Sequence, residues 1–248
     1  MASGKRRARR WDHVERELRA TVGPMIAGVD EVGRGPLAGP VVACAVIMPP
    51  DVRAIPGVND SKQLTALQRL RLAPLIRRRA ITIGLGAASA REIDRFNIYH
   101  ATTLAIRRAI ARLTSAPDHV VLDGRMIRGL NVPHTAIVGG DARCYSIACA
   151  SIVAKVTRDR VMKALAKRYP SYGWDHNVGY STAGHLAGLA AAGVTPHHRR
   201  SFVPVVQLAL ALADAVPWEG SSEPPPDVIG IDPGTALDLA TDLAPPPP

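Results

Sequence analysis

The 248-residue sequence is poor in aromatic side chains, at 4%, and contains only three cysteines. It has no apolar run of about 18 or more residues, which excludes a membrane-spanning helix. The cysteines, Cys44, Cys144 and Cys149, lie in apolar surroundings without the spacing of a disulfide framework, so we expect buried thiols in a cytoplasmic protein. The basic N-terminus contains no apolar segment, so we expect no secretory signal. Hydrophobic residues still make up 47%, which is enough for a core and excludes disorder along the whole chain.

Each end of the chain lacks charge of one sign. Residues 1–10 contain five Lys or Arg and no acid, whereas residues 219–248 contain six acids, eight of the 21 prolines and no Lys or Arg. The net charge of +10 therefore combines a body of +16 with a tail of −6. We expect a basic arm over residues 1–21, a folded domain over 22–216 and a disordered acidic, Pro-rich tail over 217–248. A basic body favours nucleic acid as the partner, with a compositional bias of the source genome as the alternative explanation.

Strand-like and helix-like stretches alternate along the body. Apolar, β-branched runs predict strands at residues 25–29, 41–48, 80–87, 119–122 and 135–138. Helical spacing of apolar residues predicts helices at residues 64–79, 99–113, 145–169, 182–192 and 203–216. Ser89 and Glu92 have the spacing of a capping box, in which two side chains satisfy backbone donors at a helix start. We predict an α/β fold with a central mixed sheet flanked by helices, followed by a mainly helical C-terminal portion.

Four acidic residues stand at the ends of predicted strands: Asp30, Glu31, Asp123 and Asp141. Ligands of open α/β sheets bind outside the carboxyl ends of the strands, so these side chains could converge on one point. Clustered carboxylates repel each other unless a cation shares the site. Hard ions such as Mg²⁺ prefer oxygen ligands, and a pair of such ions can promote displacement at a phosphodiester. The alternative is that each Asp caps a turn, where Asp is common.

The adjacent pair Asp30 and Glu31 raises a geometric difficulty. Neighbouring side chains of a regular strand point to opposite faces, so both should not face the same ions. We expect the strand to end or distort there, or one residue to act through its backbone carbonyl. Asp159 is not expected at this site, because it lies 18 residues beyond Asp141 on what should be one helix, a separation of roughly 25 Å. Flanked by two arginines, it is predicted to form a structural ion pair.

Glycine, histidine and aromatic residues give weaker signals. Gly33, Gly35 and Gly39 would let the backbone approach a ligand and present N–H groups to it, with a tight structural turn as the alternative. No Gly-Lys-Ser/Thr follows, so the segment is not a Walker phosphate loop. The basic run at residues 197–200 favours a phosphate-facing patch over a metal site. The aromatic side chains in the loop at residues 170–180 could either stack on bases or anchor their loop.

Several motifs together resemble the bacterial ribonuclease HII family. The N-terminal signature is GVDEVGRGPLAGP at residues 28–40. The others follow in the family's order: Asn59-Asp60-Ser61-Lys62, Leu122-Asp123-Gly124, Gly140-Asp141, ASIVAKVTRD at residues 150–159, Gly179-Tyr180 with His185, and His198-Arg199-Arg200-Ser201-Phe202. The resemblance covers residues 24–205, roughly three quarters of the chain, and includes neither the extreme N-terminus nor the acidic tail.

The resemblance implies an RNase H-like fold, with residues 22–216 as the catalytic domain. It implies an endonuclease that cleaves the RNA strand of RNA–DNA hybrids. Such an enzyme would also incise duplex DNA on the 5′ side of single embedded ribonucleotides, by two-metal-ion hydrolysis that leaves 3′-hydroxyl and 5′-phosphate ends. We further expect a monomer whose partners are RNA–DNA hybrid and ribonucleotide-containing duplex DNA, with no membrane association. The alternative is a non-catalytic basic nucleic-acid-binding protein, which would bind without metal and lose affinity steeply with salt.

The resemblance also assigns roles to individual residues. It places Mn²⁺ or Mg²⁺ at the four acids that stand at predicted strand ends: Asp30, Glu31, Asp123 and Asp141. It implies that three residues of the glycine-rich signature contact the ribonucleotide 2′-OH, the group that distinguishes RNA from DNA: Gly33, Arg34 and Gly35. Tyr180 would pack near the same junction, and Lys62 would contact a phosphate.

Overall fold

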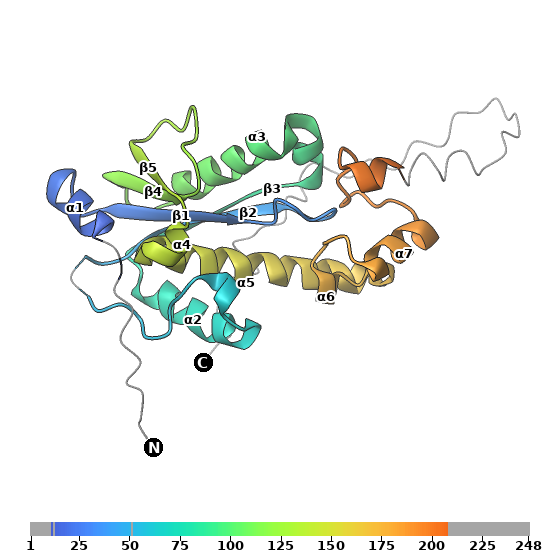
Figure 1. The fold of residues 1–248 in the computed structure, drawn as a ribbon, viewed down its shortest axis with the longest axis horizontal. Coiled ribbons are helices and arrows are strands. Elements are labelled where there is room, and N and C mark those ends of the chain that lie inside the picture. The colour runs from blue at the N-terminus through green and yellow to red at the C-terminus, as the bar shows by residue number, and fades with distance from the viewer. Residues whose placement is uncertain (1–10, 12, 51, 208–248) are drawn as a thin grey trace, which may run out of the picture.

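A five-stranded mixed sheet lies between two layers of helices (Figure 1). The computed structural model describes residues 11, 13–50 and 52–207. The strands are β1 (Ile26–Val32), β2 (Val41–Ile47), β3 (Thr82–Ala88), β4 (His119–Asp123) and β5 (His134–Ile137). The longer helices are α1 (Val14–Thr21), α2 (Ala66–Arg79), α3 (Ala90–Ala111), α5 (Tyr145–Arg168) and α7 (Ala183–Ala192). The short helical turns are η1 (Ser61–Gln63), α4 (Gly140–Arg143), η2 (Pro170–Tyr172) and α6 (Trp174–Asn177).

The strand order is β3-β2-β1-β4-β5. β1 pairs antiparallel with β2, and β2 with β3, whereas the β1–β4 and β4–β5 pairs are parallel. Helix α3 makes the connection from β3 to β4. Because β1 and β4 are parallel neighbours, with Val29 opposite Leu122, their carboxyl ends lie side by side at one end of the sheet.

β2 is buried on both faces, which explains its uninterrupted apolar sequence. Its alternate side chains serve different layers. Val42, Cys44 and Val46 pack with residues of α2 and α5, whereas Val41 and Ile47 pack with residues of α3. The sheet is therefore the middle layer of three, with an apolar core on each side.

Sequence-encoded caps mark where the flanking helices begin. The predicted capping box of Ser89 and Glu92 is confirmed at the start of α3, and Thr65 forms a second box at α2. Within α3, Asn97 leaves the helical conformation, with φ 63°. Its side chain accepts hydrogen bonds from the backbone N–H groups of Tyr99, at 2.9 Å, and of the following residue. The second half of α3 therefore begins close to residue 99, where the periodicity predicts a helix.

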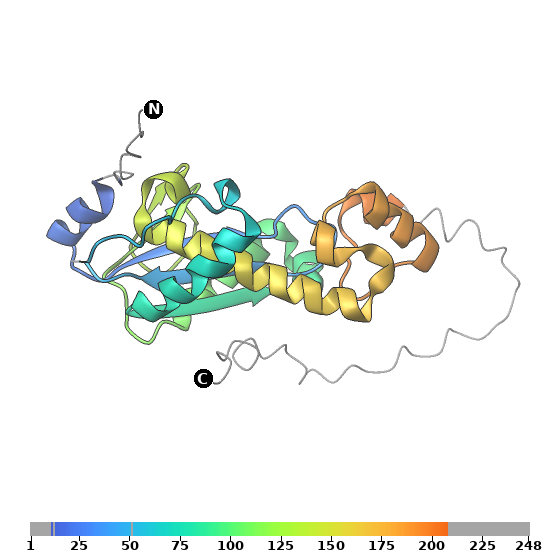
Figure 2. The ribbon, with the colours of Figure 1, turned by 90° about the horizontal axis from the view of Figure 1, so that it is seen from below.

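The C-terminal helices pack at one end of the long helix α5, beyond the sheet (Figure 2). Tyr172 and Trp174 belong to a buried cluster with Met162 and Leu165 of α5. Their exposed fractions are 3% and 0%, so the two rings anchor their loop and do not stack on bases.

The predicted fold class is confirmed, including the mixed sheet and the helical C-terminal portion. One strand boundary differs: β1 continues to Val32, so Asp30 and Glu31 lie within the strand and not after it. Of the last predicted helix, residues 203–207 are helical, and its remainder lies outside the described residues. None of the helices in the described part of the chain is long and apolar enough to cross a membrane.

Helix α1 lies inside the predicted basic arm, for which we predicted no helix. Glu15 of α1 is buried, and its Oε1 accepts hydrogen bonds from the backbone N–H and the hydroxyl of Ser146, at 2.8 and 2.6 Å. This contact joins α1 to the first turn of α5. The first ten residues and the acidic tail lie outside the described residues, so the predictions for these two segments stay predictions.

Candidate active site

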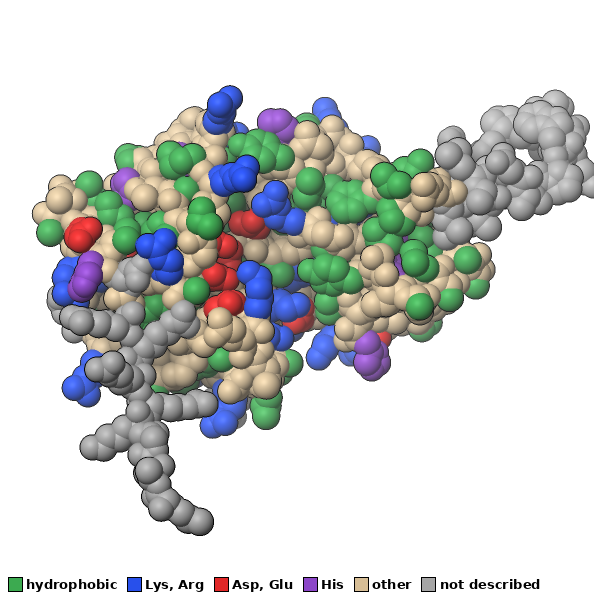
Figure 3. All heavy atoms as spheres, in the orientation of Figure 1, with side chains coloured by type: hydrophobic (Ala, Val, Ile, Leu, Met, Phe, Trp, Pro, Cys, Tyr) green, Lys and Arg blue, Asp and Glu red, His purple; other side chains and the backbone are tan. Residues whose placement is uncertain are grey.

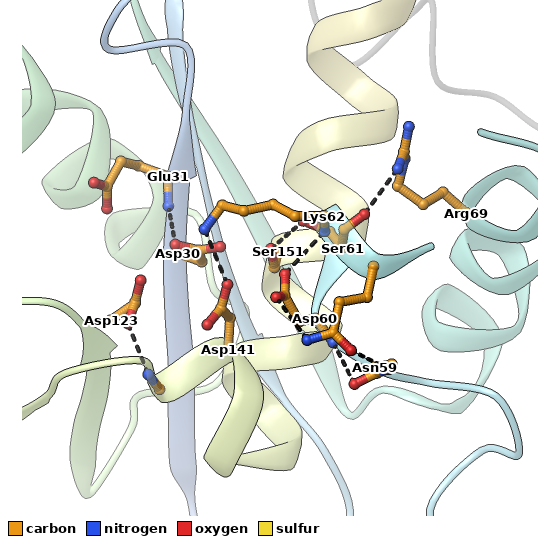
Figure 4. A network of polar contacts seen from close by, with 12 residues as sticks. Asp30, Glu31, Asn59, Asp60, Ser61, Lys62, Arg69, Asp123, Asp141 and Ser151 are labelled. Atoms are coloured by element: carbon orange, nitrogen blue, oxygen red, sulfur yellow. Dashed lines mark hydrogen bonds and ion pairs between the residues drawn. The ribbon is translucent and has the colours of Figure 1, made fainter. Parts of the chain in front are cut away.

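Three carboxylates gather where β1, β4 and α4 meet (Figure 4). Asp30 lies in β1, Asp123 ends β4, and Asp141 lies in α4. The parallel pairing of β1 with β4 places Asp30 and Asp123 on neighbouring strands, one residue beyond the last matched pair. α4 follows β5 closely, and the backbone N–H of Gly140 at its start donates to Asp123 Oδ1 at 2.7 Å. The sheet and this hydrogen bond bring three distant segments of the chain to one place.

Glu31 points away from Asp30, on the other side of β1 (Figure 4). Its backbone N–H donates to Asp30 Oδ1 at 2.9 Å, and its Oε1 accepts from Arg34 Nη1 at 3.2 Å. With Arg34 and Asp123, Glu31 lines a cavity of about 450 Å³. The predicted end of the strand at this pair is wrong, because pairing with β2 continues through Val32. The alternation of side chains continues as well, so the two carboxylates leave β1 on opposite faces.

Burial raises the pKa of three of these carboxyl groups. The pKa of Asp30 lies well above its usual range because of burial and the neighbouring charge of Glu31, which a hydrogen bond from Ser151 partly offsets. Burial also raises the pKa of Glu31, against the opposing effect of Arg34. The pKa of Asp141 is raised by burial and by Asp123 while Lys62 opposes the rise. The site thus holds more negative charge than its side chains balance.

Lys62 reaches the acids from the η1 turn. Its Nζ lies 3.2 Å from Asp141 Oδ2, and its side chain is 79% exposed. Asp60 caps the turn by accepting a hydrogen bond from the Lys62 backbone N–H at 2.8 Å, and Arg69 donates to the Ser61 carbonyl at 2.7 Å. Burial lowers the pKa of Lys62, but the Asp141 carboxylate outweighs this effect and raises it, which keeps the ammonium charged. A charged and accessible ammonium beside the acids can meet a phosphate oxygen.

The donor set suits a hard divalent cation. All four acids offer carboxylate oxygens, the ligands that Mg²⁺ prefers and Mn²⁺ accepts. Burial, and to a smaller extent repulsion between the acids, raises these carboxyl pKa values, and a bound cation would favour the charged carboxylates. Within the described residues, no three acidic, His or Cys side chains are grouped tightly enough to hold an ion. Binding would therefore require the carboxylates to turn toward the cation.

The surface around the site carries mixed charge. Figure 3 shows acidic side chains near the middle of one face, with Lys and Arg side chains on both sides of them. A basic rim attracts a polyanion, whereas the acids repel it unless a cation is bound. The distribution therefore suits a phosphate backbone that is guided to a metal-dependent centre.

The glycine segment, residues 33–39, lies beside Tyr180. Gly33 and Gly39 have φ of 92° and 83°, a conformation that other residues rarely adopt. A Cβ atom on Gly35 would lie 3.7 Å from Tyr180 Cε1, and Leu37 donates a backbone hydrogen bond to the neighbouring Gly179 carbonyl at 2.8 Å. Tyr180 is 45% exposed. The structure thus joins the predicted 2′-OH contacts to the predicted junction residue, and the contact between Arg34 and Glu31 links both to the acids.

Three further predictions have different outcomes. Of the basic run at residues 197–200, His198 and Arg199 are 1% and 0% exposed and cannot face a phosphate, whereas Arg200 is exposed. The C-terminal helices and the glycine segment cover His198 and Arg199, which charge in the sequence alone did not indicate. Asp159 forms an ion pair, as predicted, but with Lys155 and not with a flanking arginine, at 2.8 Å between Oδ1 and Nζ. The prediction that Asp141 and Asp159 share one helix is wrong, because α4 carries Asp141 and α5 carries Asp159. All three cysteines are buried, as predicted.

Comparisons with known proteins agree with this geometry. A family model described as Ribonuclease HII matches residues 27–205. A protein of Granulibacter bethesdensis named Ribonuclease HII is 52% identical over 211 residues, which cover 83% of this chain and 94% of that protein. The crystal structure of the ribonuclease H2 from Pyrococcus horikoshii is similar with a TM-score of 0.66 and 26% identity, covering 76% of this chain and 98% of that one. A crystal structure of Bst-RNase HIII in complex with Mn²⁺ shares the fold, with a TM-score of 0.58 and 19% identity over 86% of this chain and 77% of that one.

Proposed function

This chain belongs to the ribonuclease HII family of type 2 RNases H, endonucleases that cleave RNA in RNA–DNA hybrids, and we propose that it also incises duplex DNA 5′ of single embedded ribonucleotides. The proposal includes two divalent metal ions, Mn²⁺ or Mg²⁺, held by the four acids at the end of the sheet: Asp30, Glu31, Asp123 and Asp141. The observation that carries it is that the glycine segment contacts Glu31 through Arg34 and lies beside Tyr180 at Gly35. The glycine segment, which would contact the 2′-OH, would then lie next to the acids that would hold the catalytic metal ions.

The acids and Lys62 would have different roles in the reaction. When bound, the metal ions would activate the attacking water and neutralise charge on the phosphate. The buried carboxylates of Asp30 and Asp141 would hold the ions from the α5 side of β1, and Glu31 would approach from the other side. Lys62, charged and exposed, contacts a phosphate oxygen of the substrate and steadies the strand. Attack on the 5′ side of the ribonucleotide leaves a 3′-hydroxyl and a 5′-phosphate.

Recognition is assigned to the segment beside the acids. The backbone at Gly33, Arg34 and Gly35 contacts the 2′-OH, which is the group that marks RNA. The exposed ring of Tyr180 packs against the sugar of the following deoxynucleotide and favours an RNA-to-DNA junction. We also propose that the protein acts as a cytoplasmic monomer, with residues 22–216 as its catalytic domain.

The first test replaces single carboxylates by amides of the same shape. Asp30→Asn and Asp123→Asn should each lower cleavage of a one-ribonucleotide duplex by at least about 100-fold, with Mg²⁺ or Mn²⁺, because each removes a charge that holds the cation. Asp159→Asn is the matched control, since Asp159 is also a partly buried acid but pairs with Lys155 and is not one of the four acids. Cleavage at the wild-type rate by either of the first two variants would refute the metal-centre assignment.

The second test compares substrates. A one-ribonucleotide duplex and an all-RNA/DNA hybrid of the same sequence are cleaved in parallel with each metal, and the ends are mapped. Cleavage of the hybrid alone would refute the proposed incision at single ribonucleotides while leaving the family activity intact. A non-catalytic binder would cleave neither. That alternative is disfavoured, since a protein that only binds phosphates gains nothing from buried carboxylates.

A further inference from the structure

Arg199 is a fully buried cation that faces backbone carbonyl groups. Its guanidinium donates hydrogen bonds to the carbonyls of Gly33, Arg34 and Gly39, of which the Arg34 bond is 2.8 Å long. Within the part of the chain that the structure describes, no acidic side chain forms an ion pair with it. Burying a charge without a counter-ion is unfavourable unless fixed dipoles replace the lost water. Here the peptide dipoles of the glycine segment replace that water, so their orientation is tied to Arg199.

The inward carbonyls determine where the next N–H groups point. A trans peptide is planar, with its C=O and N–H on opposite sides. Because the Gly33 carbonyl points inward to Arg199, the N–H of Arg34 points outward. By the same reasoning, the inward Arg34 carbonyl turns the N–H of Gly35 outward. Among the hydrogen bonds of the described residues, neither of these two N–H groups has an acceptor, and both residues are exposed.

We propose that Arg199 is a positioning residue for ribonucleotide recognition, which turns the peptide groups of the glycine segment so that the N–H groups of Arg34 and Gly35 face the 2′-OH oxygen. This inference rests on the proposed function, in which that segment contacts the 2′-OH. A deoxynucleotide offers no oxygen to these donors. Discrimination between RNA and DNA then depends on a side chain that never touches the substrate.

The shape of arginine suits this role. Its guanidinium is a planar fork with several donors in fixed directions, whereas a lysine ammonium is a single point of charge on a flexible stem. The Phe202 ring, 5.1 Å from Arg199 Cζ, further limits the orientation of the guanidinium. Replacing Arg199 by lysine would keep the buried charge but could not hold the carbonyls of Gly33, Arg34 and Gly39 at once.

Arg158 provides a matched control. It is equally buried and also donates only to carbonyls in the described structure, those of Ala38, Pro40 and Val178, at 2.9 to 3.1 Å. None of these carbonyls belongs to the peptide groups that carry the outward N–H groups. Arg158→Lys should therefore weaken the fold near the segment without changing how the 2′-OH is read.

The experiment measures discrimination as a ratio of affinities. All proteins carry Asp123→Asn to prevent cleavage, and binding of a one-ribonucleotide duplex and of the all-DNA duplex is followed by fluorescence anisotropy with Mg²⁺. With Arg199 intact, the ratio should be about tenfold or more, the value of one hydrogen bond. Arg199→Lys should reduce it to nearly one, and Arg158→Lys should preserve it. Thermal denaturation establishes that each variant is folded at the temperature used.

The outcomes separate this inference from the proposed function. A ratio near one with Arg199 intact would refute 2′-OH recognition itself. A normal ratio that survives in folded Arg199→Lys, or that falls equally in Arg158→Lys, would overturn the role of Arg199 alone.

A second measurement does not depend on folding of the lysine variants. Hydrogen exchange at the amides of Arg34 and Gly35, in the protein with intact Arg199, should be fast without substrate. It should be slowed by the ribonucleotide duplex more than by the all-DNA duplex. Amides that are already protected in the free protein, or that both duplexes protect equally, would overturn the proposed orientation.

Discussion

Acidification should destabilise the protein through a buried histidine pair. His185 and His198 are 0% and 1% exposed, and their Nε2 atoms lie 3.1 Å apart. The backbone N–H of Thr195 donates to His198 Nδ1 at 3.0 Å, and His185 Nδ1 lies 2.8 Å from the Tyr180 carbonyl. A backbone N–H can only donate, so Nδ1 of neutral His198 accepts from Thr195 and the proton of His198 is on Nε2. A carbonyl can only accept, so His185 carries its proton on Nδ1 and its Nε2 accepts the hydrogen bond from His198 Nε2. Protonation of His198 would add a proton to Nδ1, which would then face the backbone N–H of Thr195, donor against donor.

The size of the effect follows from the pKa of His198. Burial, with a contribution from the nearby His185 and His197, lowers this pKa to about 3. The unfolded chain protonates its histidines near pH 6.5, so the stability is fully present above that pH and is lost as pH falls toward 3. Each pH unit in this interval is worth about 1.4 kcal/mol, so a change from about pH 7.5 to about pH 5 should remove about 2 kcal/mol. The pKa of His185 is also lowered by burial, which adds to the loss.

The assay is urea unfolding followed by far-UV circular dichroism at the two pH values. His198→Asn removes the titrating group, and its amide oxygen can still accept from Thr195, so this variant should lose about 2 kcal/mol less than the wild type on acidification. His100→Asn is the control, because His100 is exposed and should leave the wild-type difference unchanged. The raised pKa values of the active-site carboxyls act in the opposite direction, but they are common to all three proteins and cancel. Equal losses in wild type and His198→Asn would refute the reasoning.

Three further predictions follow from single contacts. Lys62→Met should lower kcat/KM for hybrid cleavage about tenfold, and it should reduce the slope of log K against log salt concentration by about one, because Lys62 contacts phosphate. The Tm should not change, because the Lys62 side chain is exposed. Gly39→Ala should lower the free energy of unfolding by about 1–3 kcal/mol, since the φ of Gly39 is positive and a Cβ would meet Met162 Sδ. Gly184→Ala in α7 is the control and should not lower the free energy of unfolding, because a Cβ there meets no other atom. Burial raises the pKa of Cys44 to about 12, so a maleimide should label it only after unfolding, and mass spectrometry that finds rapid labelling of the folded protein would contradict this.

Local patterning was enough for most of the fold. Apolar, β-branched runs predicted every strand of the sheet, and the Ser89–Glu92 spacing predicted where α3 begins. Strand ends also predicted which acids would be neighbours, because parallel strands present their carboxyl ends together. The end of β1 was predicted too early, since a charged pair such as Asp30 and Glu31 is not expected inside a strand. Its pairing with β2 keeps the strand regular through Val32.

Other features depended on contacts between distant segments. Lys62 and Asp141 are in contact although they are 79 residues apart in the sequence, and no local sequence pattern predicts this contact. The run at residues 197–200 looks exposed because it is charged, yet Arg199 is buried against the carbonyl of Arg34, 165 residues away. A buried charge is tolerated only when enough dipoles surround it, and those dipoles come from a segment that the sequence places far away.

The sequence by itself determined the residue types of the centre, the strands that carry them and the family to which the chain belongs. The tertiary structure alone decided the directions of the groups: Glu31 on the opposite side of β1 from Asp30, Lys62 over Asp141, and Arg199 beneath the glycine segment. The physical reason is the different range over which sequence patterns and tertiary contacts act. Periodicity and caps act over a few residues along the chain, whereas electrostatic and hydrogen-bonded contacts act over a few ångströms between segments that folding brings together.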